Sequence, residues 1–185
     1  MSEFEIVPSG RLLGADIIGF NAADKPDDDV MARIGASLGK HGVLCFRDQT
    51  LDEDQLITFT RCFGEIESYV LSGYSLDKHP EILIVSNILE DGVPIGLTDA
   101  GTTWHSDMSY ILAPPAVTIL YAKEVPVADD GQILGDTLFS STAAAYEALP
   151  QDLKDRLKGR RTFHSYEAKH ARRAQEGKSN RKPIT

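Results

Sequence analysis

The tripeptide His105-Ser106-Asp107 places an imidazole and a carboxylate two residues apart. On an extended segment, residues i and i+2 point to the same face, so both side chains can reach one ion. They would supply two thirds of the two-histidine, one-carboxylate triad that binds Fe(II) and leaves three adjacent coordination positions open. A hydrogen-bonded His–Asp pair without a metal is the alternative interpretation.

A second candidate is Gly135-Asp136-Thr137, in which a threonine hydroxyl at the start of a strand could donate to the carboxylate of a ligand. The alternative interpretation is a Gly-Asp turn that Thr137 caps. Spacing alone does not decide between the two.

The surroundings of the His-x-Asp triplet favour a functional site. It follows a loop rich in Gly, Asp and Thr over residues 87–103, and long loops in compact domains are often functional. After it come Pro114-Pro115 and an apolar strand expected over residues 117–125. A loop that leads into a rigid strand is a common place for an active site.

The other expected elements mix helices with strands. We expect helices where apolar residues recur at helical spacing between capping signals, and strands in short apolar runs. Helices are predicted over residues 29–39, 142–149 and 150–159. A further helix is predicted to begin at a capping box formed by Thr50 and Glu53 and to end at Gly64. Strands are predicted over residues 42–46, 81–86 and 161–166.

Composition narrows the class of protein. The chain has 185 residues, 19 Lys+Arg and 28 Asp+Glu, which give a formal net charge of −9. This length fits one domain over residues 1–185, and the acidic balance argues against a nucleic-acid binder that neutralises phosphates.

The basic cluster from Lys169 to Lys182 is interpreted as a solvated helix or tail. Without a signal peptide or apolar span, and with Cys45 and Cys62 expected to be reduced, a cytoplasmic location is predicted.

Several motifs in order resemble the taurine dioxygenase-like (TauD/TfdA) family. The resemblance begins with a strand and a helix and continues through the triplet to the second candidate site. Its segments are His41-Gly42-Val43-Leu44-Cys45-Phe46-Arg47-Asp48-Gln49, the helix ending at Phe63-Gly64, Ser86-Asn87-Ile88, Gly92, Pro94-Ile95-Gly96, Trp104-His105-Ser106-Asp107, Gly135-Asp136-Thr137-Leu138-Phe139 and Ala143-Ala144-Tyr146-Ala148-Leu149-Pro150. It covers the chain from about Gly10 to His164.

The resemblance implies an α+β fold with a mainly β core, a double-stranded β-helix or jelly roll with flanking helices. It also implies an Fe(II)- and 2-oxoglutarate-dependent dioxygenase, which couples oxidative decarboxylation of 2-oxoglutarate by O2 to hydroxylation of a small, anionic organic substrate. His105 and Asp107 would be the first two iron ligands, and Thr137 would hold the distal carboxylate of 2-oxoglutarate.

The family pattern also requires a second histidine ligand and, soon after it, an arginine that pairs with 2-oxoglutarate. Neither has a counterpart here, because only His164 and His170 follow Asp107 and neither lies in a matching motif. We therefore expect the N-terminal portion of a dioxygenase whose C-terminal part is missing, inactive as this chain.

The substrate is less well defined by the sequence. Val70 and Gly101 stand near the positions that hold the sulfonate in taurine-using enzymes, so taurine itself is not supported. Asn87 and Thr103 are candidate substrate contacts. Lys123 and Arg47 are interpreted as surface or salt-bridge residues rather than anion anchors. No nucleic-acid or membrane partner is expected, and a homo-oligomer is compatible with the complete enzyme.

Two other functions remain open. The chain could be a non-catalytic remnant or binding module of the same fold, in which case His105 would have no role in metal binding. It could also be a zinc hydrolase that uses His105, Asp107 and either His164 or His170. No HExxH-type motif accompanies these residues.

Overall fold

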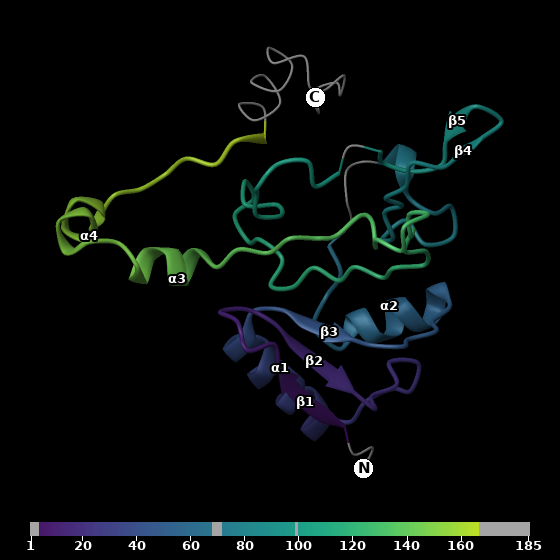
Figure 1. Cartoon of the computed structure of the whole chain (residues 1–185), viewed down its shortest axis with the longest axis horizontal. Helices are drawn as coiled ribbons and strands as arrows, with labels where there is room; N and C mark the ends of the chain where they lie inside the picture. The colour runs from purple at the N-terminus through teal and green to yellow at the C-terminus, as the bar shows by residue number, and fades with distance from the viewer. Residues whose placement is uncertain (1–3, 68–71, 99, 167–185) are drawn as a thin grey trace. The chain divides into compact units, whose positions relative to one another are not determined.

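The structure is a computed structural model that describes residues 4–67, 72–98 and 100–166 (Figure 1). Within these residues, helices and strands are mixed as the sequence predicts, and the strands close no barrel. No helix in the described part is both long and apolar enough to cross a membrane.

The chain divides into two compact units. Unit 1 comprises residues 1–66 and 119–158, and unit 2 comprises residues 67–118 and 159–185. Unit 1 is therefore built from two separate stretches of chain, and unit 2 supplies the residues between them.

A three-stranded sheet with the order β1-β2-β3 forms one layer of unit 1. β1 (Glu5–Pro8) pairs antiparallel with β2 (Ala15–Ile18), and β2 pairs parallel with β3 (Leu44–Phe46). The expected strand over residues 42–46 is confirmed as β3. β1 and β2 are additional, since two four-residue strands around a turn carry a weak sequence signal.

The helix α1 (Asp28–His41) connects β2 to β3, and it confirms the helix predicted over residues 29–39. The Asp27 side chain caps its first turn by accepting a hydrogen bond of 2.8 Å from the Val30 N–H. Val30 and Ile34 are buried, which places the apolar face of the helix in the core. The helix ends at Gly42, whose φ of 70° is left-handed and whose N–H donates to the Leu38 carbonyl.

Replacing Gly42 with alanine is expected to lower the free energy of unfolding by about 1–2 kcal/mol, because a left-handed φ is strained for any residue with a Cβ. The added Cβ would also lie 2.7 Å from Leu13 Cδ2. Urea unfolding followed by circular dichroism measures the change. Gly39→Ala is the control, since Gly39 is helical and a Cβ added there would meet no atom within 4 Å, so alanine should be neutral or stabilising. Equal losses in both variants would contradict the conformational argument.

The helix α2 (Glu53–Arg61) is also confirmed, but its capping box is not the one that the sequence indicated. Asp52, rather than Thr50, accepts from the Gln55 N–H, and the Gln55 side chain accepts from the Asp52 N–H. Leu51 lies before the helix, where its side chain is buried and its N–H donates to the Tyr121 hydroxyl. Asp52, with extended dihedrals, is the N-cap, so the helix begins later than predicted.

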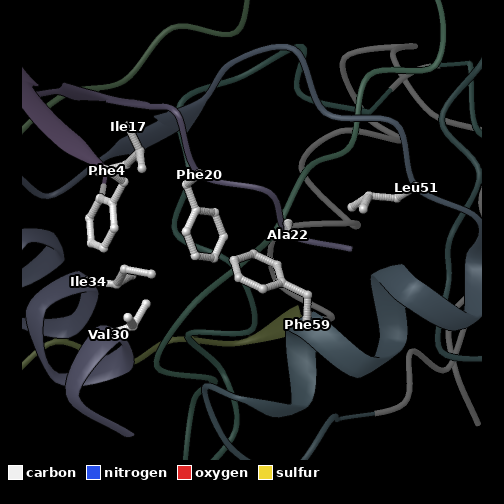
Figure 2. Close-up of a cluster of buried hydrophobic side chains, with 8 residues drawn as sticks. All are labelled: Phe4, Ile17, Phe20, Ala22, Val30, Ile34, Leu51 and Phe59. Atoms are coloured by element: carbon white, nitrogen blue, oxygen red, sulfur yellow. The ribbon is translucent and has the colours of Figure 1, made fainter. Parts of the chain in front are cut away.

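The core of unit 1 lies between α1, α2 and the sheet (Figure 2). Ile17 and Ile34 are fully buried. Phe20 lies between Phe4 and Phe59, with ring centroids 5.6 Å and 5.8 Å away. These edge-on and tilted ring pairs give the core a specific geometry in addition to buried apolar area.

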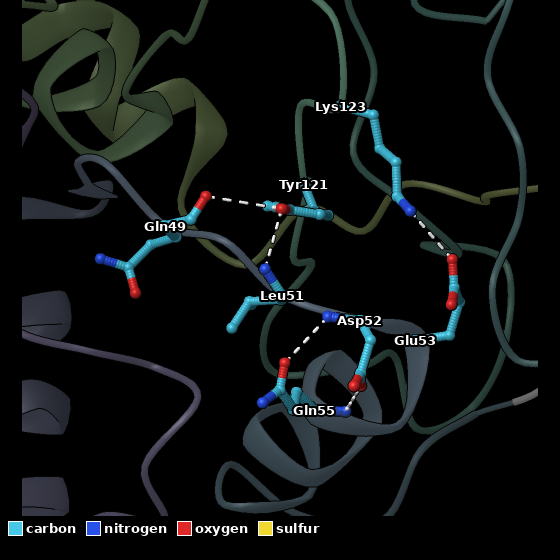
Figure 3. A network of polar contacts seen from close by, with 7 residues as sticks. All are labelled: Gln49, Leu51, Asp52, Glu53, Gln55, Tyr121 and Lys123. Carbon is cyan, nitrogen blue, oxygen red and sulfur yellow. Dashed lines mark hydrogen bonds and ion pairs between the residues drawn. The ribbon is translucent and has the colours of Figure 1, made fainter.

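A polar network joins the second stretch of unit 1 to the start of α2 (Figure 3). The Tyr121 hydroxyl accepts from the Leu51 N–H at 3.0 Å and lies 3.4 Å from the Gln49 carbonyl oxygen. Lys123 pairs with Glu53 at 2.9 Å, and elsewhere in the unit Arg47 pairs with Asp16 at 2.9 Å. The interpretation of Lys123 and Arg47 as salt-bridge residues is therefore confirmed.

Two short helices follow in unit 1. α3 (Thr142–Glu147) is capped by the Ser141 hydroxyl, and α4 (Gln151–Leu157) begins after Pro150. Both agree with the helices predicted over residues 142–149 and 150–159.

Regular structure in the described part of unit 2 consists of a 3₁₀ turn, η1 (Ser72–Tyr74), and a small hairpin. The hairpin pairs β4 (Leu89–Glu90) with β5 (Val93–Pro94), inside the stretch predicted as a loop. Residues 81–86 form isolated bridges at Leu83 and Val85 instead of the expected strand.

The prediction of strands over residues 117–125 and 161–166 is wrong. Within the described residues, neither range forms a strand. Side chains from Pro115 to Tyr121 nevertheless alternate between half-buried and exposed, the period of a strand. A strand is defined by its ladder partner, and no described segment pairs along this stretch.

Candidate metal centre

His105 in unit 2 is oriented by a backbone carbonyl. Its Nδ1 lies 2.7 Å from the carbonyl oxygen of Thr103, two residues earlier. A carbonyl oxygen only accepts hydrogen bonds, so Nδ1 must carry the proton. In a neutral imidazole with this tautomer, Nε2 is the atom that offers a lone pair to a metal ion, which is the usual arrangement of a metal-binding histidine. In the metal-free pair, an Nε2–H would instead donate to the carboxylate of Asp107.

Asp107 lies beside that nitrogen, as the two-residue spacing predicts. Its Oδ1 is 3.0 Å from His105 Nε2. Two ligand atoms that each lie about 2.1 Å from one metal ion, at right angles to one another, are separated by about 3.0 Å. The pair therefore fits neighbouring positions on an octahedral ion, and both side chains are about one-third exposed, at 34% and 36%, which leaves them accessible.

The second carboxylate oxygen of Asp107 has a partner that the sequence analysis missed. The Thr118 hydroxyl donates to Oδ2 at 2.8 Å. Thr118 follows Asp107 by eleven residues, beyond the Pro114-Pro115 turn, so no local spacing points to the contact. The only available signal was a hydroxyl residue in the apolar segment after that turn.

The chain turns sharply after Asp107. Met108 has a φ of 45°, in the left-handed region that a side chain rarely adopts, and its carbonyl accepts from the Ile111 N–H. Such strain is held in place only where the surroundings impose it, and it gathers at functional sites.

Aromatic side chains lie close to this turn within unit 2. The Tyr110 and Tyr166 rings pack edge to face with centroids 5.2 Å apart. Burial raises the pKa of the Tyr110 phenol above its usual range, and Tyr166 and the nearby Asp107 raise it further. Tyr110 therefore keeps a neutral hydroxyl to a higher pH than a free tyrosine.

A third protein ligand is not found among the described residues, where no three His, Cys, Asp or Glu side chains come together as a metal site. His164 Nδ1 instead lies 3.1 Å from the Ser109 hydroxyl. His170 lies outside the described residues, as does the basic cluster of residues 169–182.

The remaining predicted site residues are dispersed. Asn87 and Thr103 are exposed in unit 2, and Thr103 contacts His105 through its carbonyl. Thr137 is exposed in unit 1, two residues after Gly135, whose φ is 77°. Gly101 lies in unit 2, and Val70 falls outside the described residues. The roles assigned to Asn87, Thr103 and Thr137 stay predictions.

The chain is similar in sequence to known proteins over most of its length. Pentalenolactone F synthase of Streptomyces avermitilis is 36% identical over 168 residues, which cover 89% of this chain and 52% of the synthase. The alpha-ketoglutarate-dependent 2,4-dichlorophenoxyacetate dioxygenase of Cupriavidus pinatubonensis is 33% identical over 162 residues, covering 77% of this chain and 54% of that enzyme. The chain thus spans about half the length of the curated relatives it matches.

A solved structure extends the likeness to the fold. The crystal structure of a taurine dioxygenase from Burkholderia xenovorans superimposes with a TM-score of 0.59 and 26% identity, over 84% of this chain and 51% of that one. The family model described as "Taurine catabolism dioxygenase TauD, TfdA family" matches residues 5–185. The resemblance seen in the sequence motifs is confirmed, and the chain belongs to the TauD/TfdA dioxygenase family.

Proposed function

We propose that this chain carries the first two iron ligands of an Fe(II)- and 2-oxoglutarate-dependent dioxygenase. The observation that carries the proposal is the pairing of His105 Nε2 with Asp107 Oδ1 at 3.0 Å, with His105 Nδ1 held at 2.7 Å by the Thr103 carbonyl oxygen. Membership of a family whose relatives include an alpha-ketoglutarate-dependent dioxygenase supports the reaction class.

In this proposal His105 Nε2 and Asp107 Oδ1 would hold the metal ion, and the exposure of both side chains would leave it accessible to co-substrates. Bound ferrous iron would supply the redox chemistry, in which one O2 converts 2-oxoglutarate to succinate and CO2 and hydroxylates a C–H bond of the substrate. The hydroxyl of Thr137 would donate to the distal carboxylate of 2-oxoglutarate. Asn87 and Thr103 would contact the substrate from the loop that precedes His105.

The proposed substrate is a small organic anion. The relative from Cupriavidus pinatubonensis is named for 2,4-dichlorophenoxyacetate, a carboxylate, and the solved structure for taurine, a sulfonate. Both names describe compact molecules with one acidic group, and that shared chemistry is the basis of the proposal.

We also propose that a longer protein completes the fold to a jelly roll. The chain spans about half of its relatives. The stretch from Pro115 to Tyr121 alternates in burial like a strand but has no ladder partner in the described part, and Leu120 is 63% exposed. Additional strands beside this stretch would pair its backbone and cover such side chains.

Anaerobic titration of the purified chain with Fe(II) and 2-oxoglutarate tests the site. The readout is the visible charge-transfer band that forms when a 2-oxo acid chelates a ferrous ion. We expect the band in the unmodified chain, and its loss in His105→Ala and Asp107→Ala with Fe(II) binding weakened about 100-fold or more, because even outer partners of metal ligands contribute about 10- to 100-fold.

His164→Ala is the matched control, since it removes a histidine of unit 2 that contacts Ser109. The control should keep the band. Loss of metal binding in the control would instead favour the zinc hydrolase, in which His164 is a ligand. Metal binding that is unchanged by His105→Ala would favour the non-catalytic alternative and contradict the proposal.

A further inference from the structure

Thr118 engages the candidate metal ligand Asp107 through one oxygen only. Its hydroxyl donates to Oδ2 at 2.8 Å, while Oδ1 faces His105 Nε2 at 3.0 Å. An ionised carboxylate has no proton to give, so the direction of the Thr118 hydrogen bond is set. The two oxygens of Asp107 are thereby made different, with one held by protein and one turned toward the histidine.

This difference matters for a carboxylate that binds a metal. A free carboxylate can rotate about its Cβ–Cγ bond and can bind an ion through one oxygen or through both. A hydrogen bond to Oδ2 opposes the rotation, which would break it. It also disfavours the two-oxygen mode, because it occupies one lone pair of Oδ2 and draws negative charge from that oxygen. Asp107 would then occupy one coordination position, and an octahedral ion would keep a further position for a co-substrate.

We propose that Thr118 is a positioning residue that holds Asp107 as a metal ligand through Oδ1 alone. The inference rests on the proposed function and extends it to a residue for which no local sequence pattern predicts a role. Thr118 itself is exposed. Its hydrogen bond should therefore contribute little to folding, so that its loss is visible in metal binding rather than in stability.

Titration with Co(II) tests this without relying on turnover, since Co(II) is stable in air, binds N/O sites of this type and has visible bands that respond to coordination. Thr118→Val keeps the shape of the side chain and removes the hydroxyl. We expect it to weaken Co(II) binding about 10- to 100-fold and to change the visible spectrum, with the thermal midpoint within a few degrees of the unmodified chain.

Thr118→Ser restores the hydroxyl and should bring Co(II) affinity and spectrum back to within about threefold of the unmodified chain. If Thr118→Val fails to fold, Thr118→Ala takes its place, because alanine and serine differ by the oxygen alone. Equal affinities in the variants with and without the hydroxyl would overturn the role of Thr118, while loss of binding in His105→Ala would still support the proposed function. Absence of Co(II) binding in the unmodified chain would overturn the role of Thr118, whereas the proposed function is decided separately by the titration with Fe(II) and 2-oxoglutarate.

Discussion

Phe59→Ala is expected to lower the free energy of unfolding by about 3–5 kcal/mol, the largest effect that we predict for this chain. The Phe59 side chain is 4% exposed, and its ring packs against those of Phe20, Phe46 and Phe63 at centroid distances of 5.8, 5.3 and 5.4 Å. Removing it leaves a cavity among three other rings, which cannot all move to fill it. Urea denaturation followed by far-ultraviolet circular dichroism measures the loss.

Phe163→Ala is the matched control for this substitution. Phe163 is 91% exposed in unit 2, so the same chemical change removes little buried area. Its free energy of unfolding should stay within about 0.5 kcal/mol of the unmodified chain. Comparable losses at both positions would show that Phe59 does not lie in a close-packed core.

Gln49→Leu is expected to lower the free energy of unfolding by about 2–4 kcal/mol although the two side chains are similar in size. Gln49 Oε1 accepts from the Ala22 N–H at 2.7 Å, and Nε2 donates to the Phe20 and Arg47 carbonyls at 2.7 and 2.6 Å. One side chain thus pairs three backbone groups from two segments. Leucine would leave all three without that partner, and two of the contacts are partly buried.

Gln151→Leu provides the comparison in the same denaturation assay. The Gln151 side chain donates an exposed hydrogen bond to Asp155 one turn later in α4. Such a pair contributes only about a few tenths of a kcal/mol, so the variant should unfold close to the unmodified chain. If Gln49→Leu were equally mild, water would be replacing its hydrogen bonds, and the segment around Ala22 would be more open than the structure indicates.

Local chemistry explains which elements could be predicted. Helix ends depend on side chains within four residues, so α1, α3 and α4 were predictable from the Asp, Ser and Pro at their starts. The end of α1 lies at His41 rather than at residue 39, because Gly42 and not Gly39 takes the left-handed conformation that ends the helix. The predicted start of α2 was two residues too early, because the sequence contains two overlapping capping boxes, Thr50 with Glu53 and Asp52 with Gln55. Asp52 is used rather than Thr50, and the Leu51 N–H that precedes the helix donates to the Tyr121 hydroxyl, 70 residues away.

Pairing across long separations explains what could not be predicted. Residues 81–86 are apolar enough for a strand, but whether a ladder forms depends on a partner that the local pattern does not identify. In the candidate site, too, the local contact was predictable and the contact between distant residues was not. The two-residue spacing predicted that His105 and Asp107 meet, whereas the Thr118 contact depends on a chain reversal that no spacing encodes.

The discontinuous construction of unit 1 has a consequence for how such a chain can diverge. The segment that carries His105 and Asp107 is inserted between the two stretches that meet at Leu51 and Tyr121. The entropy lost in closing an inserted loop grows only with the logarithm of its length, and doubling the insert costs about 0.6 kcal/mol. Insertions and deletions around the candidate metal centre therefore cost the core of unit 1 little free energy, so the length of this segment can change without loss of the scaffold.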